Sequence, residues 1–231
     1  MGEVLCMIVL VAIVVIAIRT VFDGRSRSVR LGDAGEEKVS IYLGQLDSHR
    51  YRVFNDVMVR TKAGVTTQID HVVVSQYGVY VVETKNISGW VFASARSSEW
   101  TSTLPVIRRG WFGPSCYKYH FQNPLRQNYL HVATLAWRLK IPESSFFNFV
   151  AFPDETEFKK GYPAGVYRYS ELVSAIQSNK NKMFDVKLTR SLANEIAAVD
   201  SAITPEERAA HVMNLHCTHK CINGDGRYRA H

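Results

Sequence analysis

Two runs of β-branched residues separated by a short turn constrain the fold of this chain more than any other feature. Residues 69–75 and 79–84 are rich in valine, and residues 76–78 between them, Gln-Tyr-Gly, are typical of a turn. Such a pattern predicts an antiparallel β-hairpin. Centring the hairpin on the middle turn residue places Asp70 opposite Thr84, to within about one residue.

Two carboxyl groups and one amino group converge on this hairpin. Glu83 and Lys85 are two residues apart, so their side chains share a face of the second strand, beside Asp70 on the first. Carboxylates at one place repel each other unless a cation lies between them, and Mg²⁺ prefers such oxygen ligands. Lys85 is then placed to orient a water molecule or to stabilise charge on a phosphate. The alternative is an ion-pair cluster at a strand end, and the residue types alone leave both open.

The rest of the pattern predicts an α/β domain with a mixed sheet flanked by helices. Hydrophobic residues make up 46% of the 231 residues and charged residues 21%, which argues against a disordered chain, a collagen and a polytopic membrane protein. Strand and helix patterns follow one another in an order that suits a single α/β domain. We expect further strands at residues 51–59, 89–95, 146–152 and 165–169, and helices at residues 123–140, 169–178 and 188–202.

A further helix is expected to open the domain. Asp33 is placed to cap it, Glu36 follows three residues later, and Val39 and Leu43 recur at helical spacing. Glu36 shares a line with Val39 and Leu43, so it faces the core side of the helix. The alternative is that Glu36 serves only as the capping-box partner of Asp33.

The N-terminus predicts a membrane anchor. Residues 4–18 are all apolar, and with residues 19–22 the run reaches about 28 Å, close to the ~30 Å hydrocarbon core of a bilayer. The competing interpretations are a cleaved signal peptide, which normally has a basic start and a small-residue cleavage site, and a buried helix of a soluble core. Arginines follow the run and none precedes it, which orients the following domain toward the cytoplasm. We therefore expect a single-pass protein of the inner (cytoplasmic) membrane. Its transmembrane anchor covers residues 1–22 and contacts the lipid bilayer through residues 4–22. A basic juxtamembrane linker follows over residues 23–30.

The positive charge of the chain is compatible with a polyanionic partner. The formal net charge is +7, and residues 105–121 interleave basic and aromatic side chains. This composition suits contact with phosphates and unpaired bases, for which we nominate Arg108, Arg109, Trp111 and Lys118. It also suits a membrane interface, and a long loop whose aromatic residues pack on their own domain is the third alternative.

Residues 181–231 are expected to form a C-terminal helix and a tail. Cys217 and Cys221 lie among histidines there, but their spacing matches no dependable zinc-site pattern, so we favour an unstructured tail over a zinc site. Four cysteines in a chain of this length are too few for a disulfide framework.

Several of these features together form an ordered set of motifs. They are Gly35-Glu36-Glu37, Gln68-Ile69-Asp70-His71, Glu83-Thr84-Lys85-Asn86 with Gly89, Trp100, and Asn123-Pro124-Leu125-Arg126-Gln127 with His131. The set resembles the nuclease-related domain (NERD) family, which is similar to the PD-(D/E)xK nuclease superfamily. The motifs cover roughly residues 31–140, and the later strand and helix patterns extend the expected domain to residues 31–180.

This resemblance implies a restriction-endonuclease-like fold and a metal-dependent nuclease, an endonuclease or an exonuclease. Asp70 and Glu83 would bind Mg²⁺ or Mn²⁺, Lys85 would act at the attacking water, Glu36 would complete the acidic cluster, and Gln127 would lie beside the site. DNA is the expected substrate, RNA is a second candidate, and no particular protein partner is indicated. The superfamily usually has proline before the aspartate, where this chain has isoleucine.

Two alternatives stay open beside the nuclease. The first is a non-catalytic, membrane-tethered module that binds nucleic acid or a protein on a nuclease fold; the presence of Asp70, Glu83 and Lys85 together favours the enzyme. The second concerns Gln127 and His131, which are four residues apart and therefore share a helix face. They either point into the site or form a hydrogen-bonded pair at the edge of the core.

Overall fold

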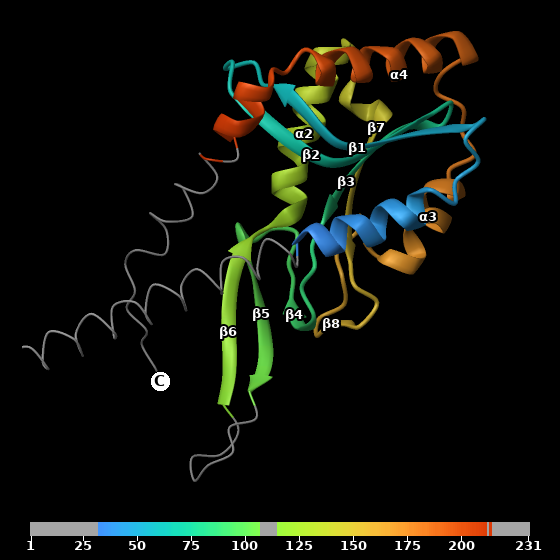
Figure 1. Cartoon of the computed structure of the whole chain (residues 1–231). Coiled ribbons are helices and arrows are strands. Elements are labelled where there is room, and N and C mark those ends of the chain that lie inside the picture. The colour runs from blue at the N-terminus through green and yellow to red at the C-terminus, as the bar shows by residue number, and fades with distance from the viewer. Residues whose placement is uncertain (1–31, 107–114, 212, 214–231) are drawn as a thin grey trace, which may run out of the picture.

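A computed structural model describes residues 32–106, 115–211 and 213 of the chain. Within them, strands form two mixed sheets, in the order β1-β2-β3-β7-β9 and in the order β6-β5-β4-β8 (Figure 1). The first sheet contains β1 (Tyr51–Arg60), β2 (Thr66–Ser75), β3 (Gly78–Thr84), β7 (Phe146–Phe152) and β9 (Val166–Arg168). The second contains β4 (Gly89–Phe92), β5 (Glu99–Val106), β6 (Ser115–Gln122) and β8 (Thr156–Phe158). The helices are residues 32–43, α2 (Pro124–Leu139), η1 (Glu143–Ser145), η2 (Tyr169–Glu171), α3 (Leu172–Ser178), α4 (Val186–Ser201) and residues 205–211.

The central hairpin of the first sheet is confirmed. Strands β2 and β3 are antiparallel, with Ser75 paired with Gly78 and His71 paired with Val82. Continued by one residue, this register places Asp70 opposite Glu83. The sequence predicted Asp70 opposite Thr84 to within about one residue, so the register agrees with the prediction. Beyond the hairpin, β3 runs parallel to β7, and β7 runs parallel to β9, which makes the sheet mixed.

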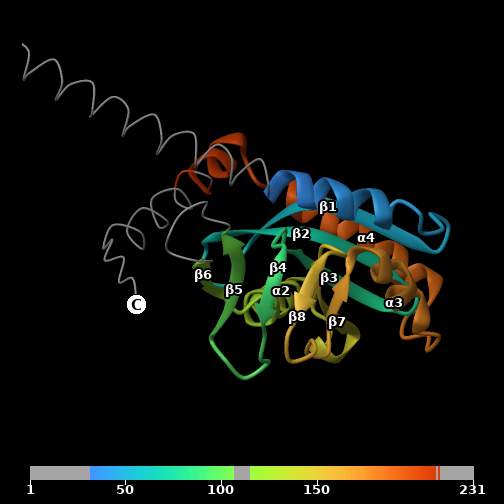
Figure 2. The same cartoon turned by 90° about the horizontal axis from the view of Figure 1, so that it is seen from below.

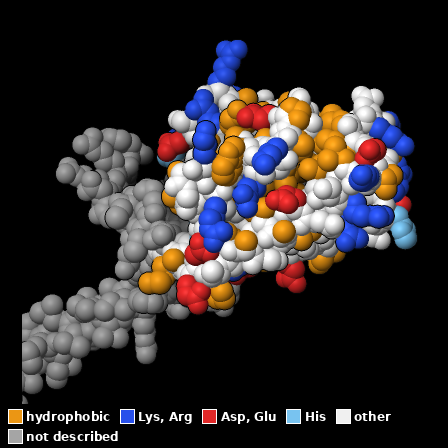
Figure 3. Space-filling view, turned by 90° about the horizontal axis from the view of Figure 1, so that it is seen from above, with side chains coloured by type: hydrophobic (Ala, Val, Ile, Leu, Met, Phe, Trp, Pro, Cys, Tyr) orange, Lys and Arg blue, Asp and Glu red, His pale blue; other side chains and the backbone are white. Residues whose placement is uncertain are grey.

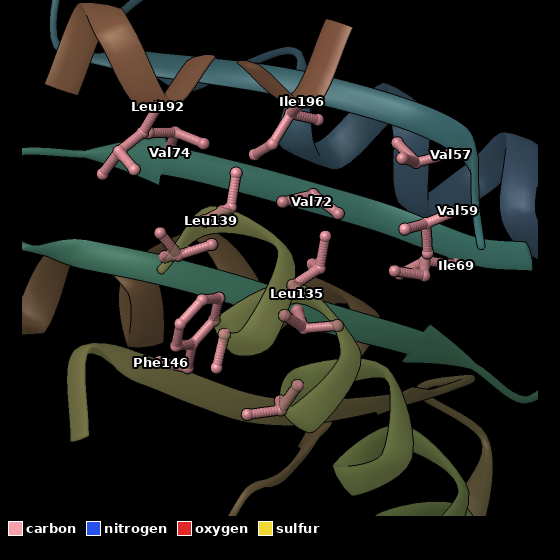
Figure 4. Close-up of a cluster of buried hydrophobic side chains, with 14 of the residues drawn as sticks. Val57, Val59, Ile69, Val72, Val74, Leu135, Leu139, Phe146, Leu192 and Ile196 are labelled. Carbon is pink, nitrogen blue, oxygen red and sulfur yellow. The ribbon is translucent and has the colours of Figure 1, made fainter. Parts of the chain in front are cut away.

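Helices cover both faces of the first sheet. On one face, α2 and α4 pack against β1, β2 and β3, as the side chains of Figure 4 show: Leu135 and Leu139 from α2 and Leu192 and Ile196 from α4 meet the valines of β2. On the other face, residues 32–43 and α3 cover the alternate side chains of the same strands. The core therefore includes α4, although this helix follows residue 180, where we expected the domain to end.

The second sheet departs from the single sheet that we expected. Strands β4, β5 and β6 are antiparallel neighbours, and β8 pairs in parallel with β4, so these strands form a separate layer (Figure 2). Its buried face packs Trp100 and Phe121 against Phe152 at the end of β7. Within the range 105–121, residues 105–106 end β5 and residues 115–121 lie on β6, so these parts are strand and not loop. Residues 107–114 lie outside the described residues.

The start of the first helix also differs from the expectation. Asp33 is itself helical, so it is not the N-cap and does not form the expected capping box with Glu36. Asn123, by contrast, caps α2 as expected, because its side chain accepts a hydrogen bond from the backbone N–H of Leu125 and Pro124 follows it.

The predicted anchor is not tested by the described part of the chain. No helix among residues 32–106, 115–211 and 213 is both long enough and apolar enough to cross a membrane. Residues 4–22, residues 23–30 and the pair Cys217 and Cys221 all lie outside the described residues.

Candidate active site

The hairpin β2–β3 brings Asp70, Glu83 and Lys85 to one place. The Oδ2 atom of Asp70 accepts a hydrogen bond of 2.7 Å from the backbone N–H of Thr84, which joins the two strands beyond their last regular pair. The backbone N–H of Lys85 donates to the carbonyl of Ala151 on β7, so the lysine is held in line with the sheet. Asp70 and Glu83 therefore lie on strands, and Lys85 directly follows β3.

Lys85 is the centre of a polar network. Its Nζ atom lies 2.5 Å from Oε1 of Glu83 and 3.1 Å from Oε1 of Gln127 on α2. The side chain of Glu83 is 4% exposed and that of Lys85 is 21% exposed, so this ion pair is largely shielded from water. Gln127, predicted at the site, reaches it from the first turn of α2.

The pKa values of Asp70 and Glu83 shift in opposite directions in this arrangement. Burial raises the pKa of Asp70 well above its usual value, and Glu83 and Glu36 raise it further. Burial also acts to raise the pKa of Glu83, but the positive charge of Lys85 outweighs it and lowers the pKa overall. For Lys85, burial acts to lower the pKa, and Glu83 more than reverses this effect. The shifts in pKa therefore favour the ionised forms of Glu83 and Lys85 and the protonated form of Asp70.

Glu36 approaches the same site from the helix of residues 32–43. Burial raises the pKa of Glu36, and the negative charges of Asp33, Asp56 and Glu83 add to the effect. The helix can come this close because residue 35 is glycine: a Cβ atom there would lie 2.8 Å from the Cβ atom of Asn86. Glycine before Glu36 therefore has a packing reason.

His131 lies on the site side of α2, as its spacing from Gln127 predicted. Its Nδ1 atom is 3.3 Å from the hydroxyl of Thr67, and its Nε2 atom is 3.6 Å from Oε2 of Glu83, which is too long for a hydrogen bond. Both Nε2 of His131 and Oε2 of Glu83 are buried and have no hydrogen-bond partner within the described chain. A buried carboxylate oxygen without a partner is costly, and a bound cation or water would remove that cost.

The donor set fits a hydrated Mg²⁺ better than a metal enclosed by protein. Among the described residues, no group of three or more His, Cys, Asp or Glu side chains is arranged to hold a metal ion. Mg²⁺ commonly uses only one or two carboxylates and keeps several water ligands. Asp70 and Glu83, with the unpartnered Oε2 atom of Glu83, supply oxygen ligands of that type.

Other residues of the motif set have structural roles. The side-chain amide of Asn123 donates to the carbonyls of Ser94, Ala95 and Ser97, which fixes the start of α2 to the loop before β5. The Nε1 atom of Trp100 donates to the carbonyl of Ser94 in the same loop. His71 adjoins Asp70 and therefore faces the other side of β2, where its Nδ1 atom lies 2.8 Å from Oδ1 of Asn55. Burial lowers the pKa of His71 to about 4, so it is neutral near pH 7.

Tyr119 on β6 lies near Lys85, and the sequence did not single it out. Its ring is half exposed, is stacked with Phe121 at a centroid distance of 6.1 Å, and its hydroxyl is among the groups that raise the pKa of Lys85. Lys118, which we nominated, alternates with Tyr119 and points to the opposite face of the second sheet. The strict alternation of aromatic and polar residues over 117–122 was the signal for this strand. Arg108, Arg109 and Trp111 lie outside the described residues.

The sequence profile of the nuclease-related domain, NERD, matches residues 31–153. The chain is also similar to an uncharacterized protein of Bacillus anthracis, with 34% identity over 169 residues that cover 71% of this chain and 73% of the relative. No solved structure matches the chain.

Proposed function

The chain belongs to the nuclease-related domain family, and on that premise we propose that it is a metal-dependent nuclease that hydrolyses phosphodiester bonds of DNA. The observation that carries the proposal is the position of Lys85, which lies between Glu83 and Gln127 and near Asp70, whose pKa is raised by burial. The proposal includes a restriction-endonuclease type of fold, which the mixed main sheet with helices on both faces supports.

In this proposal, Asp70 and Glu83 hold Mg²⁺ or Mn²⁺, and Glu36 adds negative charge at the edge of the site. The cation supplies Lewis acidity toward a water nucleophile and the phosphodiester. Lys85 orients the water and offers positive charge to the phosphate, and Gln127 fixes the lysine through its side-chain oxygen. Because the pKa of Asp70 is raised, a cation at this carboxyl group would compete with a proton.

Nucleic acid would approach along the strand β6. Tyr119 offers a half-exposed ring beside Lys85, and stacking on Phe121 holds that ring in place. Aromatic rings of this kind stack on unpaired bases with little sequence preference. Arg108, Arg109 and Trp111 follow β5 in the sequence and remain nominated for phosphate and base contacts, as does the exposed Lys118.

We also propose that residues 4–22 anchor the chain in the inner membrane, with the nuclease-related domain in the cytoplasm. The support is the uninterrupted apolar run of residues 4–18 and the arginines that follow it. The expected consequence is a nuclease restricted to substrates near the membrane.

A second candidate function rests on a specific observation. Lys85 already neutralises Glu83, and no group of three metal-ligating side chains occurs among the described residues. A site whose charges are balanced without a cation is also what a non-catalytic module that binds nucleic acid or a protein would show.

The deciding experiment uses the full chain, purified in detergent, with supercoiled and linear DNA and with RNA, in Mg²⁺, Mn²⁺ or EDTA. We expect DNA cleavage that requires the metal and that is abolished in Asp70→Asn and Lys85→Ala. The matched control is Glu157→Gln, which removes a carboxylate from an exposed Lys159–Glu157 pair and should cleave like the wild type.

The same proteins should be melted with and without Mg²⁺. The nuclease proposal expects Mg²⁺ to stabilise the wild type and Lys85→Ala, but not Asp70→Asn. If the wild type neither cleaves nor gains stability from Mg²⁺ or Mn²⁺, the binding module replaces the nuclease. Cleavage that persists in Asp70→Asn also rules out the site as we assign it.

A further inference from the structure

A polar cavity lies at the opposite end of the main sheet from Lys85. It has a volume of about 440 Å³ and lies between the start of β1, the turn between β2 and β3, and the first turns of α4. The length of β3 separates it from the acidic site, roughly 20 Å at about 3.3 Å per residue. Figure 3 shows Lys and Arg side chains at this end of the molecule, where α4 begins, and others spread over the rest of the same face.

Three arginines from two parts of the fold line this cavity. Arg50 precedes β1, Arg52 belongs to β1, and Arg190 lies on α4, and no Asp or Glu lines the cavity with them. None of the three pairs with a carboxylate within the described chain, whereas Arg60 and Arg208 pair with Glu207 and Asp200. Three like charges around one cavity repel each other, and an anion between them would remove that repulsion.

Arg50 is held in place before any ligand binds. Its Nη2 atom donates a hydrogen bond to the hydroxyl of Tyr77, and its guanidinium lies 5.4 Å from the ring centre of Tyr77 and 5.9 Å from that of Tyr51. Tyr77 is buried in the turn and also lines the cavity. A guanidinium fixed in this way loses less conformational entropy when it binds a ligand.

Two nearby carboxylates are engaged elsewhere. Asp185 caps α4 by accepting from the backbone N–H of Leu188, and Asp47 accepts from the backbone N–H of His49. Asp47 contributes only weakly to the raised pKa of Arg50, for which the hydrogen bond to Tyr77 is the main cause. Neither carboxylate lines the cavity, so the weak effect of Asp47 on Arg50 leaves most of the positive charge there uncompensated.

We propose that this cavity binds a small molecule with more than one phosphate group, of the size of a nucleotide. Its volume lies within the usual range for small-molecule sites, roughly 300–1,000 Å³. Three guanidinium groups match about three negative charges and present the paired N–H donors that recognise phosphate oxygens. A concave site of this size suits a compact ligand better than the side of a nucleic-acid duplex. The proposal does not depend on nuclease activity.

Calorimetric titration of the full chain in detergent, with EDTA and at about 0.15 M salt, tests the proposal. The probes are inorganic phosphate, pyrophosphate and ATP. We expect pyrophosphate and ATP to bind more tightly than phosphate, and Arg190→Gln and Arg52→Gln each to weaken them by about tenfold or more, because each removes a charge-assisted hydrogen bond. The matched control is Arg138→Gln, an exposed arginine at the end of α2, which should bind like the wild type.

Three results would overturn the proposal. One is the absence of binding heat for all three probes. Another is a loss of affinity in Arg138→Gln equal to that in Arg190→Gln, since binding would then be non-specific attraction to positive charge. The last is that a DNA oligonucleotide displaces ATP and itself binds tenfold more weakly to Arg190→Gln. The cavity would then be part of a DNA-binding path.

Discussion

The two ends of strand β3 hold charges in opposite ways. At the end with Lys85, the acids Asp70, Glu83 and Glu36 surround one lysine, largely out of water, and shift one another's pKa values. At the turn end, three arginines face an open cavity with no carboxylate to pair with. At the first end, the charge of Glu83 is compensated by Lys85 within the protein. At the second end, the positive charges can be compensated only by solvent ions or by a ligand.

This difference predicts how each end responds to substitution. A buried ion pair that loses one partner leaves an uncompensated charge in a poorly hydrated place. An exposed charge without a partner loses little when it is removed, because water and salt already screen it. Stability should therefore depend strongly on the acidic end and weakly on the arginine end.

The largest effect is expected for Glu83→Gln. It leaves the Nζ atom of Lys85 without its carboxylate, and we expect the free energy of unfolding to fall by about 3 kcal/mol, measured by urea denaturation without metal. The control is Glu157→Gln, which breaks a pair of similar geometry, Nζ to Oε2 at 2.6 Å, but with Glu157 61% exposed, and should cost less than about 0.5 kcal/mol. Equal losses in the two variants would show that the acidic end is not a coupled, shielded network.

The sequence predicted much of the acidic end because its signals are local. The valine-rich runs on either side of residues 76–78 predicted the hairpin, and Asn123-Pro124 predicted the start of α2. We could therefore expect four residues to lie near one another, namely Asp70, Glu83, Lys85 and Gln127. The sequence left an ion-pair cluster open as an alternative, but it could not predict that the pKa of Asp70 rises while that of Glu83 falls. These shifts depend on how deeply each carboxyl group is buried and on its distance from Lys85, which the sequence does not give.

Other parts were hidden for physical reasons. Strand β5 contains Pro105 and several threonines, which obscured the second sheet, although the alternation in β6 was readable. The arginine cavity joins Arg50 and Arg190, which are far apart in sequence and share no motif. Only the packing of α4 against β1 brings them together.

A smaller effect, of opposite sign, is expected for Asp70→Asn. The pKa of Asp70 is higher in the folded protein than in the unfolded chain, so the folded state binds more protons and its stability falls as the pH rises through the folded pKa. Asn cannot ionise but can still accept from the N–H of Thr84, so we expect the variant to lack this fall and to be more stable by about 1 kcal/mol at pH 8 without metal. Urea denaturation from pH 5 to 8 measures both curves. A variant that is less stable than the wild type at pH 8 would show that the Asp70 carboxylate stabilises the metal-free fold.

The smallest effect is expected at the arginine end. Arg52→Gln and Arg190→Gln each remove one of three like charges, so without phosphate we expect the free energy of unfolding to stay within about 0.5 kcal/mol of wild type, or to rise slightly at low salt. Arg208→Gln is the contrast, because it breaks the 2.5 Å contact with Asp200, about one-third exposed, and should cost up to about 1 kcal/mol. Salt should reduce any gain in the first two variants, since it screens the repulsion that they relieve. If Arg190→Gln costs more than Arg208→Gln, then Arg190 supports the fold, and its lack of a carboxylate partner no longer indicates an anion site.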